Sequence, residues 1–138
     1  MRRLLAASAL LATLTACMTS PSPHDYLPAV DPGGIRGDLT TTLDHGSVRV
    51  ELLAVDDSSY IVLSRDRVAV APFRVVRMAV FEPIGTTTRN GRAPSSDHRS
   101  QLRYASRFPF GIPVDVMSRL LEKSGQKRPD DLASPSQQ

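Results

Sequence analysis

The chain has 138 residues, of which 41% are hydrophobic and 22% are charged, with 11 Pro, one Cys and no Trp. This length accommodates one small domain, the single Cys excludes a fold built on internal disulfides, and the absence of an apolar run near the roughly 20 residues of a spanning helix excludes a polytopic membrane protein. The formal charge is +3, but setting aside residues 1–16 leaves 15 Lys and Arg against 14 Asp and Glu, so the charge does not indicate a class of partner.

Residues 1–17, MRRLLAASALLATLTAC, have the layout of a secretory signal. Arg2 and Arg3 form a positive n-region, and residues 4–14 form an apolar h-region that is too short for an ordinary spanning helix. A signal peptide over residues 1–16 is therefore predicted. The alternative from the residues alone is a buried core Cys at the end of an N-terminal helix.

Leu14-Thr15-Ala16-Cys17 resembles the lipobox of bacterial lipoproteins. The resemblance implies attachment of diacylglycerol to the Cys17 thiol, cleavage before Cys17 and acylation of the new amino group. Two or three acyl chains, at about 0.8 kcal/mol per buried CH₂, anchor a protein stably in a membrane. Met18 stands where an Asp would signal retention in the inner membrane, so the resemblance implies a lipid-anchored protein of the cell envelope, at the outer rather than the inner membrane.

Residues 17–37 are predicted to be the lipidated Cys and a flexible tether. Pro and Gly are dense here and oppose both helices and strand ladders, so the segment can reach roughly 60 Å at about 3.1–3.3 Å per residue. Residues 33–37, GGIRG, lack the Lys-Ser/Thr and the preceding strand of a phosphate-binding loop, and a turn is expected instead.

Residues 38–84 carry the patterns of five short strands. The alternation of apolar and polar residues that starts at Ser47 is typical of a half-buried strand, and turn residues separate one segment from the next. Five antiparallel strands in so short a stretch predict a small barrel, in which closure removes exposed edges. The expected strands are residues 39–43, 47–55, 59–63, 67–71 and 75–81.

Residues 43–59, LDHGSVRVELLAVDDSS, resemble the Sm-like small β-barrel, in which a long second strand bends across the core. The Gly that permits this bend is replaced here near Glu51. Sm-like barrels form rings, so the resemblance implies that a homo-oligomer is an option. They usually bind RNA, but an exported lipoprotein meets little RNA, which argues against a nucleic-acid partner.

One or two short α-helices are expected after the barrel. Residues 85–100 are polar without periodicity and predict a loop, with Ser96 or Asp97 as the cap of a short helix. Residues 101–126 are predicted to be helical, and residues 127–138 a disordered tail. The second helix begins near Pro113 and ends near Gly125, with an apolar stripe formed by Val114, Met117, Leu120 and Leu121.

No catalytic, cofactor or metal site is predicted. His24, His45 and His98 lack the spacing of metal ligands, and the only thiol belongs to the lipid anchor. No Ser lies in a Gly-x-Ser-x-Gly elbow. Asp56 and Asp57 are interpreted as turn residues because adjacent carboxylates in a hairpin point apart. The protein is therefore expected not to be an enzyme.

Cations gather in residues 89–107, where Asp97 is the only acid. One interpretation is a solvated loop and helix face. The other is a site for anionic lipid or glycan. Tyr104, Phe108 and Phe110 nearby are interpreted as core or docking residues. The candidate anion-binding residues are Arg89, Arg92, Arg99, Arg103 and Arg107.

Three functional hypotheses follow. The first is a non-enzymatic envelope lipoprotein whose β domain binds another envelope protein as an accessory or scaffold. The second is a module that binds anionic lipid or glycan through residues 89–107. The third is homo-oligomerisation through sheet edges. The first is favoured because no catalytic constellation is found on the tethered domain.

Overall fold

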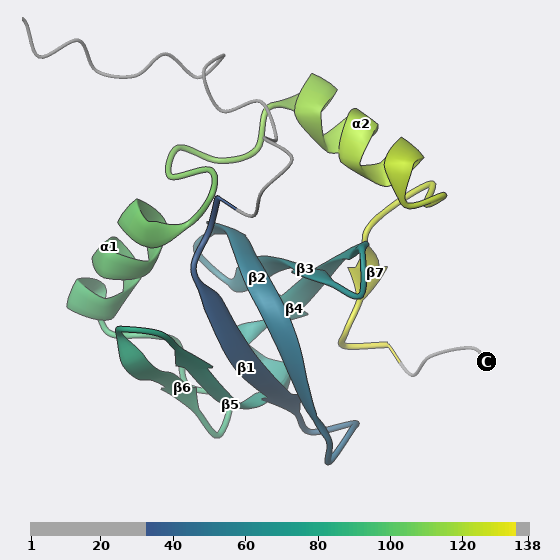
Figure 1. The fold of residues 1–138 in the computed structure, drawn as a ribbon. Helices are drawn as coiled ribbons and strands as arrows, with labels where there is room; N and C mark the ends of the chain where they lie inside the picture. The colour runs from purple at the N-terminus through teal and green to yellow at the C-terminus, as the bar shows by residue number, and fades with distance from the viewer. Residues whose placement is uncertain (1–32, 135–138) are drawn as a thin grey trace, which may run out of the picture.

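The computed structural model describes residues 33–134. Leu14, Thr15, Ala16, Cys17 and the signal peptide lie outside the described residues. The elements, in chain order (Figure 1), are β1 (Arg36–Thr41), β2 (Ser47–Val55), β3 (Ser59–Ser64), β4 (Arg67–Pro72), the 3₁₀ helix η2 (Phe73–Val75), β5 (Val76–Phe81), β6 (Gly85–Arg89), α1 (Ser96–Ala105), α2 (Val114–Lys123) and β7 (Asp130–Asp131).

The described chain is mainly β, with two short helices, as expected. Its strands form one seven-stranded sheet in the order β6-β5-β1-β2-β3-β4-β7. The prediction of a closed five-stranded barrel is wrong. Within the described residues, β4 and β5, the strands that would close such a barrel, pair instead with β7 and β6. Backbone groups that closure would satisfy are therefore satisfied by two additional strands, and the sheet stays open.

Two segments outside the predicted strands also join the sheet. Residues 85–89, predicted as loop, form β6, in which Thr86 and Thr88 lie opposite Val80 and Ala79 of β5. In the predicted disordered tail, Asp130 and Asp131 form β7 and pair in parallel with Ala69 and Val70. Long-range pairing therefore orders stretches whose composition alone does not favour a strand.

An irregularity in β2 divides the apolar residues between the two faces of the sheet. The register with β3 shifts between Leu52 and Ala54, which leaves Leu53 as an extra residue. Leu53 and Ala54 consequently both belong to one apolar cluster, and Leu52 and Val55 to the other. A bulge thus lies in β2 two residues after Glu51, near the place where the Sm-like pattern has its Gly.

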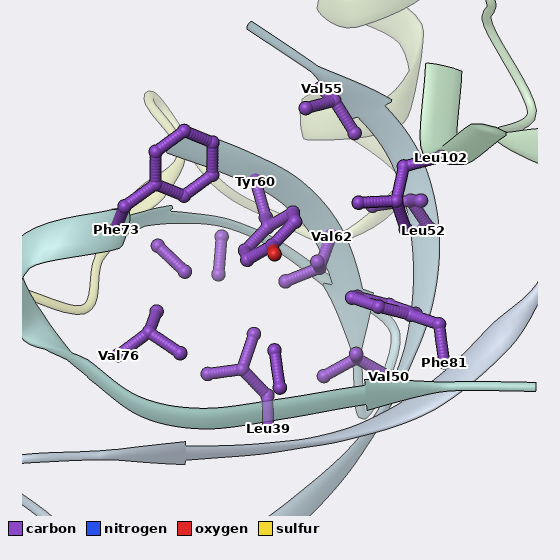
Figure 2. Close-up of a cluster of buried hydrophobic side chains, with 13 residues drawn as sticks. Leu39, Val50, Leu52, Val55, Tyr60, Val62, Phe73, Val76, Phe81 and Leu102 are labelled. Carbon is purple, nitrogen blue, oxygen red and sulfur yellow. The ribbon is translucent and has the colours of Figure 1, made fainter. Parts of the chain in front are cut away.

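Tyr60 lies at the centre of the larger cluster. Figure 2 shows it between Phe73 and Phe81, whose ring centroids are 4.9 Å and 5.3 Å from its own. Its hydroxyl lies 2.9 Å from Thr87 Oγ1 and 2.6 Å from Thr88 Oγ1. Both threonines are buried because a register shift in the β5–β6 ladder makes Thr87 an extra residue. Burial raises the pKa of the Tyr60 hydroxyl above its ordinary value.

We expect Tyr60→Phe to lower the free energy of unfolding by about 1–3 kcal/mol, because it leaves the buried hydroxyls of Thr87 and Thr88 without their shared partner. Urea denaturation measures the change. Tyr104→Phe is the matched control, since Tyr104 is 89% exposed and its hydroxyl is in water. Equal stability of the two variants would contradict a structural role for the Tyr60 hydroxyl.

The helices follow the predicted signals with small corrections. Ser95, rather than Ser96 or Asp97, caps α1, and its side chain accepts a hydrogen bond from the His98 amide at 3.2 Å. In α2 the buried positions are Val116 and Leu120, which are four residues apart and pack in the smaller cluster with Leu53 and Val68. Val114, predicted to lie on the apolar stripe, is 85% exposed.

Gln126 takes the place of a strand partner beside β4. The backbone N–H of Val68 donates to Gln126 Oε1 at 2.8 Å, and Gln126 Nε2 donates to the carbonyl oxygen of Val68 at 3.0 Å. Ser124 Oγ also donates to Gln126 Oε1, at 2.6 Å. β7 pairs with Ala69 and Val70 but does not reach Val68. The buried Gln126 side chain therefore satisfies both the N–H and the carbonyl oxygen of Val68.

Candidate functional site

The described chain enters the domain beside the end of α1. The Gly34 amide donates to Glu51 Oε1 at 3.0 Å, and the Ile35 amide donates to the carbonyl oxygen of Ala105 at 3.2 Å. A Cβ on Gly34 would lie only 2.2 Å from the Leu52 carbonyl oxygen, so the close approach requires glycine. The segment that was predicted as a tether is therefore fixed to the domain from Gly34 onward.

Arg107, one of the five candidate anion-binding residues, forms an internal ion pair. Its Nε lies 2.8 Å from Glu51 Oε1, and the side chains of Arg107 and Glu51 are only 10% and 8% exposed. A guanidinium in this position is not presented to a ligand at the surface. Its role in the described fold is to compensate a buried carboxylate.

Arg99 and Arg103 converge on Asp57 in the β2–β3 turn. Arg103 Nη2 lies 2.8 Å from Asp57 Oδ1, and Arg99 Nη1 lies 3.8 Å from the same oxygen. Arg99 also lies over the ring of Phe73, with Cζ 5.8 Å from the centroid. Both arginines therefore serve the packing of α1 against the sheet, and the predicted set of five does not form one site.

The pair of adjacent carboxylates at Asp56 and Asp57 is a turn, as interpreted from the sequence. The amides of Ser58 and Ser59 donate to Asp56 Oδ1 at 2.8 Å and 2.6 Å. Burial by itself raises the pKa of Asp56, but the hydrogen bonds from Ser58 and Ser59 outweigh it and hold the pKa below its ordinary value. The two carboxylates have different partners and do not act together.

Arg89 and Arg92 lie at a different end of the domain, next to two arginines that are distant in sequence. The Asn90 amide donates to the Arg77 carbonyl oxygen at 2.7 Å, and the Gly91 amide donates to that of Val76 at 2.8 Å. These bonds bring the end of β6 onto the start of β5 and the 3₁₀ helix, where Arg74 lies. Among the described residues, no ion pair joins any of the exposed side chains of Arg74, Arg77, Arg89 and Arg92.

A groove of about 620 Å³ opens on the face of the sheet that carries Tyr60. It lies between the β1–β2 hairpin on one side and the β3–β4 turn with β7 on the other. Leu39, Val50 and Ala69 line it and also belong to the larger apolar cluster, so the groove continues from the core. The remaining apolar lining residues are Leu43, Val48 and Leu132.

Polar side chains surround this apolar lining. Arg67 binds Asp130 through two hydrogen bonds of 2.8 Å and 2.9 Å. The bond from Arg67 holds the pKa of Asp130 below its ordinary value. The other charged residues that line the groove are Asp44 and Arg65. Sequence reasoning missed this groove because its residues come from both ends of the domain and no local pattern links residues near 40 to residues near 130.

The aromatic residues beside the predicted cationic segment divide between the interior and the surface. Phe108 is buried and packs in the smaller apolar cluster, whereas Tyr104 and Phe110 are 89% and 76% exposed. Of the two interpretations, core or docking residues, the first is therefore wrong for Tyr104 and Phe110, and the second stays a prediction for them. Tyr104 lies in the last turn of α1, and Phe110 lies in the connection to α2.

Neither α1 nor α2, the helices of the described part, is long and apolar enough to cross a membrane. Within residues 33–134, no three His, Cys, Asp or Glu side chains are grouped so that they could hold a metal ion. Comparisons with models of protein families, with curated proteins and with solved structures find no match.

Proposed function

We propose that the protein is a lipid-anchored lipoprotein of the bacterial envelope, at the outer rather than the inner membrane, and that its β domain is a non-enzymatic interaction module that binds another envelope protein. The lipobox-like residues that end at Cys17 support the anchor. The groove between the β1–β2 hairpin and β7 is the observation that supports the binding role, because apolar residues of the larger cluster, Leu39, Val50 and Ala69, line it.

The chemistry of the groove favours a partner segment with apolar side chains. Its volume of about 620 Å³ falls in the usual range of ligand sites, roughly 300–1,000 Å³. Leu43 at its edge is 54% exposed and adds an apolar side chain that a partner can bury. The ion pair of Arg67 and Asp130, together with Arg65, supplies polar groups that can orient a bound chain.

Site-specific photocrosslinking in living cells tests this proposal. A photoreactive residue is placed in the full-length protein at Leu43 or Arg65 in the groove, and at Gln101 or Thr86 as exposed controls. The proposal expects one and the same envelope protein to be captured from both groove positions and from neither control. Capture from the controls at the same yield, or no capture from the groove, would contradict it.

A substitution adds a second readout. With the photoreactive residue at Arg65, Leu43→Asp is expected to abolish capture, because a charge replaces an apolar contact of the partner. Val114→Asp is the matched control, since Val114 is also an exposed apolar residue but lies outside the groove. Equal loss in both variants would show that the groove does not carry the interaction.

Binding of anionic groups is the alternative function. The structure gives Arg99, Arg103 and Arg107 internal carboxylate partners, so this alternative rests on Arg89 and Arg92. It is favoured by one specific observation, namely that Arg74 and Arg77 lie at the same end of the domain.

A further inference from the structure

Within residues 33–134, no helix covers one half of the outer face of the sheet, which is the face opposite the Tyr60 cluster. Phe108, Val116 and Leu120 pack with Leu53 and Val68, and so cover the β2 and β4 side of that face. On the β5 and β6 side, within the described residues, Arg77, Met78 and Arg89 are exposed. This half of the face therefore has side chains that are available to a ligand.

A bulge in β5 turns two consecutive residues toward this face. In the ladder with β1, Met78 is opposite Thr40 and Val76 is opposite Thr41, which leaves Arg77 without an opposite residue. Val76 is accordingly buried, while Arg77 and Met78 are both exposed. In a regular strand the side chains of Arg77 and Met78 would point to opposite faces. The bulge thus gives the outer face a cation that a regular strand would direct inward.

The neighbouring strand adds a second cation to the same face. Arg89 is directly opposite Met78 in the β5–β6 ladder, and residues opposite each other in a ladder have side chains on one face. Arg77, Met78 and Arg89 are therefore neighbours on the outer face. Met78 is 42% exposed.

The turn after β6 brings two more arginines to this end of the sheet. Gly91 has a positive φ of 75°, and a Cβ at this position would lie 2.9 Å from the Arg74 carbonyl oxygen. The Arg92 amide donates to the Arg89 carbonyl oxygen at 3.2 Å. The backbone of residues 89–92 therefore packs against that of Arg74, and the side chains of Arg74 and Arg92 extend from this contact into solvent.

On the uncovered half of the outer face, two acidic residues lie at the end away from the four arginines. Asp38 and Glu82 both bind Arg49, whose Nη1 and Nη2 lie 3.0 Å and 3.4 Å from their oxygens. Along the chain, Glu82 lies between Arg77 and Arg89, and Asp97, in the first turn of α1, follows Arg92. One end of the surface is thus balanced in charge, and the other end carries Arg74, Arg77, Arg89 and Arg92 with no ion pair among the described residues.

We propose that Arg74, Arg77, Arg89 and Arg92 form a binding surface for clustered phosphate groups, presented either by a membrane of anionic phospholipid or by a soluble polyphosphate. Guanidinium groups bind phosphate oxygens through two parallel hydrogen bonds and are weakly hydrated, so several on one surface favour a ligand with several phosphates. This proposal deepens the alternative function of anion binding and depends neither on the acyl anchor nor on the groove.

Binding to two probes tests the proposal with a Cys17→Ala chain that begins at residue 17, which carries neither the acyl chains nor the apolar segment of residues 4–14. The first probe is inositol hexakisphosphate, titrated in a calorimeter. The second is vesicles of phosphatidylcholine with or without phosphatidylglycerol, followed by sedimentation. Binding to the phosphate probe is expected to weaken as salt is added.

Two double variants with equal changes in net charge separate the surface from overall charge. Arg77→Gln with Arg89→Gln is expected to weaken binding roughly tenfold or more. Arg36→Gln with Arg128→Gln, at exposed positions elsewhere in the described chain, is expected to leave it nearly unchanged. Circular dichroism checks that both variants are folded.

The two probes also identify the source of the phosphate. Loss of binding to both probes in the first double variant supports a site for clustered phosphates in any form, and loss with vesicles alone supports a membrane-surface site. Equal weakening in the two double variants, or no binding of either probe by the parent chain, would overturn the proposal. None of these four outcomes bears on the acylation of Cys17 or on crosslinking from the groove.

Discussion

Replacing Arg107 by Ala is expected to lower the free energy of unfolding by about 3–5 kcal/mol at neutral pH. The substitution leaves Glu51 as a buried carboxylate without its cation, and breaking a buried ion pair from one side typically costs this much. Glu51 also accepts the hydrogen bond of the Gly34 amide, so the chain entry is expected to loosen as well. Chemical denaturation measures the first effect, and hydrogen exchange of the Gly34 amide measures the second.

Two controls define the interpretation of this loss. Arg119→Ala breaks an ion pair of 2.7 Å between side chains that are 57% and 58% exposed, and it is expected to cost about 0–1 kcal/mol. Combining Arg107→Met with Glu51→Leu is expected to recover most of the stability, because no unpaired charge is then buried. If Arg107→Ala and Arg119→Ala had the same small effect, the internal role of Arg107 would be refuted.

Gln126→Leu is expected to lower the free energy of unfolding by about 2–6 kcal/mol. The new side chain has a similar size, but the buried N–H and carbonyl oxygen of Val68 both lose their partner, and each such group costs about 1–3 kcal/mol. Since small domains are stable by only about 5–15 kcal/mol, the variant is expected to unfold near ambient temperature or at low denaturant.

Gln126→Glu makes this prediction more specific. Glutamate keeps an oxygen that accepts from the Val68 amide, but when ionised it has no donor for the carbonyl oxygen and adds a buried charge, so the loss at neutral pH is expected to be at least as large as that of Gln126→Leu. Gln101→Leu, at an exposed position in α1, serves as the control and is expected to be nearly neutral. A Gln126→Leu variant as stable as Gln101→Leu would show that the amide does not substitute for a strand partner.

The strands that could be predicted are those specified by local patterns. Alternation from Ser47, the turn residues at Asp56 and the tight turn at Arg65 place β2, β3 and β4 to within one residue of the structure. The end of α2 at Lys123 could also be predicted, because it is followed by Gly125, which adopts a positive φ of 67°. These signals depend on neighbours in the sequence and need no knowledge of the rest of the fold.

The rest could not be predicted because it depends on contacts between distant residues. Thr86 to Thr88 become strand only because β5 offers an edge and Tyr60 offers a hydroxyl. The partnership of Glu51 with Arg107, 56 residues apart, has no local signature. The bulges in β2 and β5 also have no local signature, although each of them changes the face to which a side chain points.

The candidate site shows the same limit. Proximity in the sequence grouped Arg89 with Arg99, Arg103 and Arg107, whereas the fold gives the last three internal partners and brings Arg74 and Arg77 to Arg89. A cluster of charges in a sequence contains both structural and exposed members. Only the position of the acidic residues in the fold separates them.

The intact mass of the protein extracted from the membrane fraction, measured beside a Cys17→Ala variant, tests the anchor most directly. We expect a chain that begins at Cys17 and carries additional mass from acyl chains, and a variant that lacks this modification. An unmodified full-length chain in the soluble fraction would contradict the anchor, and the search for an envelope partner in the groove would lose its basis.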